Sequence, residues 1–191
     1  QQPTGRKNAM STRGFIAFAN DTNDYTELLT HYDGYPDHML TNIITLINRD
    51  GIDTVRDTMC KHTYWSTVNH NTPDIAGVEP DENADYGTPA RCAWESQAYN
   101  RTFVTGYGEY VTNDNAPRVI TIEDNPLETE LFEDTIWNEF GYIIHADGTV
   151  DTYANEFATG WKKIATTVPA KHADKSYKKI ANEIIDGYYP N

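Results

Sequence analysis

Apolar and polar residues follow two different periods along the first sixty residues of the chain. Residues 14–19 form a short apolar run, a turn-rich cluster occupies 20–24, and 25–31 resume an extended pattern, which together predict a β-hairpin. From residue 38 the period becomes helical, because the apolar residues of 39–47 fall on one face. A second amphipathic helix is expected from 52 to about 62.

The middle of the chain has less regular patterning. Residues 63–68 predict a strand, whereas 69–90 are rich in Asn, Asp, Pro and Gly and have no period, so a long loop is expected there. Strand-like runs then occupy 98–104, 107–111 and 118–123. The acidic segment 127–138 is consistent with a short helix.

The last third contains the strongest turn signal. Segments 142–146 and 149–153 flank Asp147-Gly148, a dipeptide that suits a tight hairpin turn. A strand is expected at 160–167 and a helix at 174–186, stopped by Gly187. These elements predict an α+β fold, in which residues 10–191 form a single domain with a mainly antiparallel sheet and two or three covering helices. Residues 1–9 are polar, basic and aperiodic, and we interpret them as an added remnant or an extension outside that domain.

The net charge of the chain limits the kinds of molecule that it could bind. The 191 residues include 15 Lys and Arg against 29 Asp and Glu, a net charge of −14, which opposes unaided binding to nucleic acid or to an anionic membrane. No apolar run reaches the roughly 20 residues that a membrane helix needs. Segment 74–139 has fifteen acidic residues against three arginines, so it forms either a solvated acidic surface or a face that binds a basic partner. The carboxylates that would make such a contact are Asp81, Glu82, Asp85, Glu128 and Glu130.

The segment 31–38, with the sequence His-Tyr-Asp-Gly-Tyr-Pro-Asp-His, is the densest polar and aromatic stretch. In one interpretation His31 is a catalytic base oriented by Asp33 or Asp37. In the other, Asp33 begins a tight turn and Asp37 caps the following helix after Pro36. Asp33, Tyr35 and Asp37 are also the candidate binding residues of this segment.

The spacing His31-x-Asp33-Gly recurs at His145-x-Asp147-Gly. Two histidines and two carboxylates could hold a divalent metal if both turns met, which makes His145 a further catalytic candidate. The hairpin already explains the second copy, so no metal and no cofactor are expected.

Other chemistry-bearing residues give weaker signals. Cys60 and Cys92 are expected to be free thiols. Several aromatic side chains are spaced either for stacking against a ligand or, more commonly, for packing: Tyr64, Trp65, Trp94, Tyr99, Tyr107 and Tyr110.

Segments 10–17 (Met-Ser-Thr-Arg-Gly-Phe-Ile-Ala) and 31–36 (His-Tyr-Asp-Gly-Tyr-Pro) resemble the opening of a group of small phage-encoded proteins. Those proteins begin with a Met-Ser-x-Arg strand and continue to a His-aromatic-Asp-Gly-Tyr-Pro turn. The resemblance implies a viral accessory protein acting in the cytoplasm of an infected bacterium, and it implies no particular reaction.

Two hypotheses of function follow. The first is a non-enzymatic protein that binds a basic host or defence protein through its acidic surface, without contact to nucleic acid or membrane. The alternative is a small hydrolase or a ligand-sequestering protein with its site at the junction between His31 and Asp37.

Overall fold

The computed structural model describes residues 12–20, 24–111, 117–121, 138–156 and 160–188. Within these residues nine strands form one sheet, and eight of them follow the order β4-β5-β3-β2-β1-β7-β8-β9. The ninth strand, β6, pairs with the first half of β2, along the same edge on which β3 pairs with the end of β2. Neighbouring strands are antiparallel except for the pairs β1–β7 and β2–β3. The strands are β1 (Arg13–Ala19), β2 (Asp24–Thr30), β3 (Tyr64–Val68), β4 (Arg101–Val104), β5 (Gly108–Val111), β6 (Arg118–Thr121), β7 (Asn138–Ile144), β8 (Val150–Glu156) and β9 (Gly160–Thr167).

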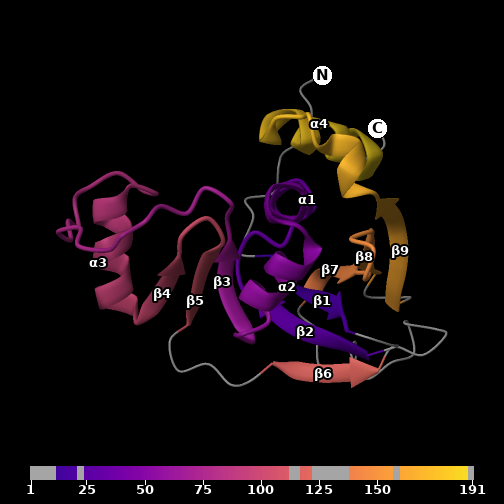
Figure 1. Cartoon of the computed structure of the whole chain (residues 1–191), viewed down its shortest axis with the longest axis horizontal. Helices are drawn as coiled ribbons and strands as arrows, with labels where there is room; N and C mark the ends of the chain where they lie inside the picture. Colours follow the sequence, from indigo (N-terminus) through magenta and orange to yellow (C-terminus); the bar gives the residue numbers. More distant parts are fainter. Residues whose placement is uncertain (1–11, 21–23, 112–116, 122–137, 157–159, 189–191) are drawn as a thin grey trace.

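The helices are distributed unevenly around this sheet (Figure 1). Helices α1 (Met39–Asp50) and α2 (Ile52–Met59) cover one face, and α4 (Tyr177–Tyr188) lies beside α1. A short 3-10 helix, η3 (Pro169–His172), also contacts α1. Helix α3 (Pro89–Tyr99) lies next to β4 at the far end of the sheet, so it is separated from the other helices.

Strand alternation divides the core into two clusters. Ile16 and Phe18 of β1 point toward α1 and α2, where they join the larger cluster around Trp65. Phe15 on the opposite face meets Trp161 edge to face, with ring centroids 5.3 Å apart. β1 is buried on both faces, which explains why its sequence is continuously apolar.

The predicted α+β class is confirmed. The sheet is mostly antiparallel, and the β1–β2 hairpin, the helical segment after residue 38 and the hairpin at Asp147-Gly148 are all present. Gly148 has a φ of 82°, the positive value for which that turn selects glycine. Cys60 and Cys92 are free thiols.

Several predicted boundaries are wrong. β7 begins at Asn138, before the strand expected at 142–146, and α2 ends at Met59 instead of near 62. The strand expected at 98–104 begins only at Arg101, because 98–99 complete α3. The Thr88 hydroxyl accepts a hydrogen bond from Arg91 N, and Pro89 occupies the first turn, so this helix has a capped start that the loop-like composition concealed. The last helix begins at Tyr177 instead of 174 and includes Gly187. Most of the acidic segment 127–138 lies outside the described residues.

Candidate functional site

The turn between β2 and α1 is fixed by close backbone contacts. Gly34 N donates to Thr12 O at 2.9 Å, and a Cβ on Gly34 would lie only 2.8 Å from that oxygen. The Tyr142 hydroxyl donates to Gly34 O at 2.6 Å. Exposed Asp33 has a φ of 57°, in the left-handed region that Asp tolerates better than most residues. This turn therefore has a structural role in joining β1 and β7 to the helix.

The expectation that Asp37 caps α1 is wrong. The N-cap residue is His38, and its side chain makes no capping hydrogen bond. The helix instead continues from a preceding turn, in which Tyr35 O accepts a hydrogen bond from Met39 N at 2.8 Å. The Tyr35 ring packs against Phe140, with centroids 5.5 Å apart.

A cavity of about 320 Å³ lies at the β4-β5-β3-β2 end of the sheet. Trp65 of β3 points toward α1 and α2, so its neighbours Tyr64 and Ser66 point to the opposite face, where they line the cavity. The lining residues are His31, Tyr32, Tyr64, Ser66, Tyr99, Arg101 and Val111. His31 is the only candidate from the 31–38 segment named above that is among them.

His31 is held in place by β3. His31 N donates to Trp65 O at 3.0 Å, which extends the β2–β3 ladder beyond the end of β2. Its Nδ1 lies 2.7 Å from the Tyr64 hydroxyl. Burial, with the positive charges of Arg13 and Arg101, lowers the pKa of His31, so its imidazole is neutral at neutral pH.

Arg101 supplies the positive charge of the cavity lining. Its Nη1 donates to Glu109 Oε1 at 2.7 Å, and Glu109 is only 5% exposed. Burial raises the pKa of the Glu109 carboxyl, and the Arg101 charge opposes that rise. The guanidinium carbon lies 5.4 Å from the Tyr99 ring centroid and 5.8 Å from that of Tyr32. The cavity is thus lined by one guanidinium and three tyrosines, and no carboxylate lines it among the described residues.

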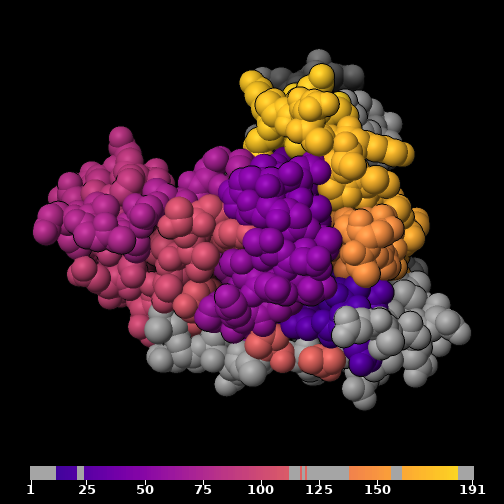
Figure 2. All heavy atoms as spheres, viewed as in Figure 1, coloured from indigo at the N-terminus to yellow at the C-terminus, as the bar shows by residue number. Residues whose placement is uncertain are grey.

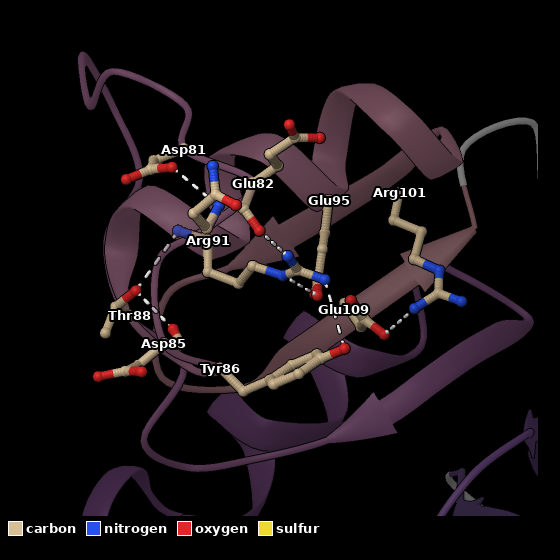
Figure 3. Close-up of polar contacts among 10 residues, drawn as sticks. Asp81, Glu82, Asp85, Tyr86, Thr88, Arg91, Glu95, Arg101 and Glu109 are labelled. Carbon is tan, nitrogen blue, oxygen red and sulfur yellow. Dashed lines mark hydrogen bonds and ion pairs between the residues drawn. The ribbon is translucent and has the colours of Figure 1, made fainter.

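A second arginine organises the chain before α3. The Arg91 guanidinium lies 4.6 Å from the Tyr86 ring centroid and 4.5 Å from that of Trp94 (Figure 3). It pairs with Glu95 at 2.8 Å, and it also donates to the backbone carbonyl of Glu82. We call residues 74–88 the acidic loop. Arg91 therefore fixes the acidic loop to α3.

The carboxylates of the acidic loop point into solvent. Asp81, Glu82 and Asp85 are exposed, as predicted for a binding surface, and so are Asp74 and Glu79. Asp81 accepts a hydrogen bond from Asn83 N at 2.8 Å, whereas Asp85 contributes its backbone carbonyl to the Thr88 hydroxyl at 2.7 Å. The loop and α3 form a lobe at one side of the molecule (Figure 2). The predicted contact residues Glu128 and Glu130 lie outside the described residues.

His145 belongs to a separate cluster. Its Nε2 lies 2.9 Å from Asp151 Oδ2 and its Nδ1 lies 3.3 Å from the Tyr25 hydroxyl. Tyr25 is near the start of β2 and His31 follows its end, so the two histidines are separated by roughly 20 Å at about 3.3 Å per strand residue. The structure does not bring His31, Asp33 and His145 together. In the described parts of the chain, no group of three or more His, Cys, Asp or Glu side chains could hold a metal ion.

The residues of these regions that the sequence analysis did not name include Arg91, Arg101 and Glu109. The spacing of Arg91 and Glu95 by four positions, after Thr88 and Pro89, is a helix signal that identifies the first. Arg101 and Glu109 have no such signal in the sequence, because they come together only when β4 and β5 pair in the observed register.

No protein-family model, curated protein or solved structure matches the chain. No helix in the described residues is long and apolar enough to cross a membrane. Function is therefore inferred from the residues and their geometry.

Proposed function

We propose that this chain is a non-enzymatic accessory protein, of the phage type that its opening resembles, and that its acidic loop binds a basic surface of a host or defence protein. The observation that carries the proposal is the fixed acidic loop, which holds five exposed carboxylates on a backbone anchored by Arg91.

Electrostatics support this assignment. From residue 69 to residue 100 the only Lys or Arg is Arg91, which already contacts Glu95 and the Glu82 carbonyl. The exposed carboxylates therefore act together on an approaching cationic surface, which accelerates association most strongly at low salt.

The loop also carries an aromatic anchor. Tyr86 is 84% exposed, although its ring lies against the Arg91 guanidinium. Exposed tyrosines that are held in place lose little conformational freedom on binding, and they frequently contribute much of the affinity of protein interfaces. A surface with an exposed tyrosine among carboxylates suits a partner that presents an apolar recess surrounded by Lys or Arg.

The test is a triple substitution, Asp81→Asn with Glu82→Gln and Asp85→Asn. Asn at 81 keeps the acceptor for Asn83 N, and the contacts from residues 82 and 85 use backbone carbonyls, so the loop should keep its conformation. Proteins retained from a bacterial lysate at low salt by the unmodified chain, and released at high salt, should be lost from the variant. Mass spectrometry identifies them.

A matched control removes three carboxylates elsewhere: Asp53→Asn, Asp57→Asn and Asp174→Asn, all at exposed positions. This control changes net charge equally and should retain the same proteins. If both triple variants lose them equally, net charge and not the acidic loop is responsible. If the loop variant retains them, the acidic loop is not the binding surface.

A further inference from the structure

We infer that the cavity lined by His31, Tyr99 and Arg101 binds a small ligand in which a flat ring carries one anionic group, such as a phosphate or a carboxylate. This site is separate from the acidic loop, and it does not depend on the function proposed above. It combines three features, which are considered in turn: the sign of its charge, its aromatic walls and its size.

The charge of the lining is opposite to that of the molecule. The chain has a net charge of −14, but no carboxylate lines this cavity among the described residues, and Arg101 does. Glu109 pairs with Arg101 through Nη1, yet a guanidinium has five N–H donors and can bind a second anion through the others. Arg13 is close enough to His31 to add to the positive potential. These groups favour an anion and disfavour a cation.

The walls favour a ring. Tyr32, Tyr64 and Tyr99 contribute aromatic side chains from three different segments, and Arg101 lies over the rings of the first and the last. The Tyr99 ring contacts Arg101 and meets the Trp94 ring at 87°, yet Tyr99 is 53% exposed, so part of its ring surface is accessible to a ligand. The Tyr64 hydroxyl is bonded to His31 Nδ1, and the Ser66 side chain beside it on the same face of β3 supplies a hydroxyl that can orient a polar ring substituent.

The size limits the ligand. Small-molecule sites span roughly 300 to 1,000 Å³, so a cavity of about 320 Å³ is at the lower end. It suits one flat ring whose anionic group is attached by a short arm or through one sugar, as in an aryl carboxylate or a nucleoside monophosphate. A dinucleotide or a long acyl chain would exceed it.

The experiment measures binding of four probes to the full chain by isothermal titration calorimetry: uridine 5′-monophosphate, indole-3-acetate, uridine and inorganic phosphate. We expect saturable binding of one or both of the first two, at least about tenfold tighter than that of uridine or phosphate. The tighter of the first two shows which combination of ring and anionic group fits the cavity better. The absence of saturable binding for both would overturn the proposal, as would uridine or phosphate binding equally well.

Substitutions then locate the site. Arg101→Gln combined with Glu109→Gln removes the cation without leaving a buried carboxylate unpaired, and should weaken binding by about tenfold or more. Tyr99→Leu at an exposed position should weaken it about threefold. The matched control Arg56→Gln removes a positive charge on α2 and should leave affinity unchanged. Unchanged affinity in both cavity variants would overturn the assignment to this cavity.

Because the acidic loop is not altered in these variants, retention of a basic protein partner should be the same as in the unmodified chain. Failure of the ligand assay and failure of the partner assay are thus independent results.

Discussion

Arg91 lies in the first turn of α3 and Arg101 begins β4 just after that helix, and the two arginines have nearly the same chemical setting. Each guanidinium lies over two aromatic rings and pairs with one glutamate. Arg91 contacts residues close to it in sequence, including a carbonyl of the acidic loop, whereas Arg101 joins β4 to β5 and to Tyr32 beyond β2. The same set of interactions therefore shapes a local loop in one place and a cavity between distant strands in the other.

The glutamates of the two ion pairs differ in burial, and this difference affects how much the loss of each arginine should cost in stability. The Glu95 side chain is 17% exposed and lies on the surface of a helix, while that of Glu109 is 7% exposed within the sheet. The Arg91–Glu95 pair joins residues four apart on one helix, and such a pair contributes at most about 0.5 kcal/mol to stability. Loss of one partner from a buried pair is far more costly, because the remaining charge stays desolvated.

The largest predicted effect is therefore on the free energy of unfolding after Arg101→Leu. Glu109 would remain buried without its partner, and we expect a loss of about 3 kcal/mol at neutral pH, measured by urea denaturation. Adding Glu109→Gln should recover most of this loss, because a neutral side chain is less costly to bury. No recovery in the double variant would show that the loss comes from packing and not from the carboxylate.

The loss of stability in the Arg101→Leu variant should depend on pH in a definite direction. Burial already raises the folded-state pKa of Glu109 above its unfolded value, and loss of Arg101 should raise it further. The folded Arg101→Leu variant then binds more protons than the unfolded chain, so its deficit should shrink as pH falls through this raised pKa. A deficit that is constant between about pH 7.5 and pH 4.5 would contradict this account.

The second prediction concerns acidification of the unmodified chain. The folded-state pKa values of His31, His70 and His172 are lowered, chiefly by burial, so the unfolded chain binds more protons near pH 6. Their contribution to stability is complete above the unfolded value of about 6.5 and is lost as pH falls below it. The urea midpoint should therefore decrease from about pH 7.5 to pH 5.5, by less than the three histidines alone would cause, because the raised pKa of Glu109 acts with the opposite sign.

His31 connects this pH dependence to the cavity. On acidification, the urea midpoint of a His31→Gln variant should decrease less than that of the unmodified chain, because one of the three histidines with a lowered pKa is gone. An equal decrease would mean that acid sensitivity belongs to the other two histidines. NMR titration of the imidazole protons measures each pKa directly.

The third prediction is local. Arg91→Met should leave the global unfolding transition almost unchanged but increase amide hydrogen exchange across the acidic loop, because the contacts to Tyr86 and the Glu82 carbonyl are lost. Arg91→Lys keeps the charge without the planar fork and should lose part of the protection. Unchanged exchange in Arg91→Met would show that turns within the loop fix it without the arginine.

The sequence predicted the acidic loop much better than it predicted the cavity. Exposure of Asp81, Glu82 and Asp85 follows from local composition, because a stretch rich in Asp, Asn, Pro and Gly cannot bury its polar groups. The hairpins and α1 likewise follow from local period and turn chemistry.

The cavity could not be predicted in the same way. It requires Arg101 to lie opposite Val111 and His31 to lie next to β3, and those neighbours depend on strand order and register. The repeated His-x-Asp-Gly spacing at His31 and His145 suggested a shared site. Spacing within a motif does not show where in the sheet each copy lies, so the sequence could not reveal that the two copies are far apart. β2 separates the two by its own length.

The smallest predicted effect on stability distinguishes two tyrosines that lie against the two arginines. Tyr86 is 84% exposed and Tyr99 is 53% exposed, so Tyr86→Leu and Tyr99→Leu should each change the free energy of unfolding by no more than about 0.5 kcal/mol. Their effects on binding should differ completely. Tyr86→Leu should weaken retention of a basic protein partner and leave binding of an anionic ring unchanged, because the Tyr86 ring is on the acidic loop. Tyr99→Leu should do the reverse, because its ring lines the cavity beside Arg101. If either substitution weakened both kinds of binding, the acidic loop and the cavity would be one continuous binding surface instead of two independent sites.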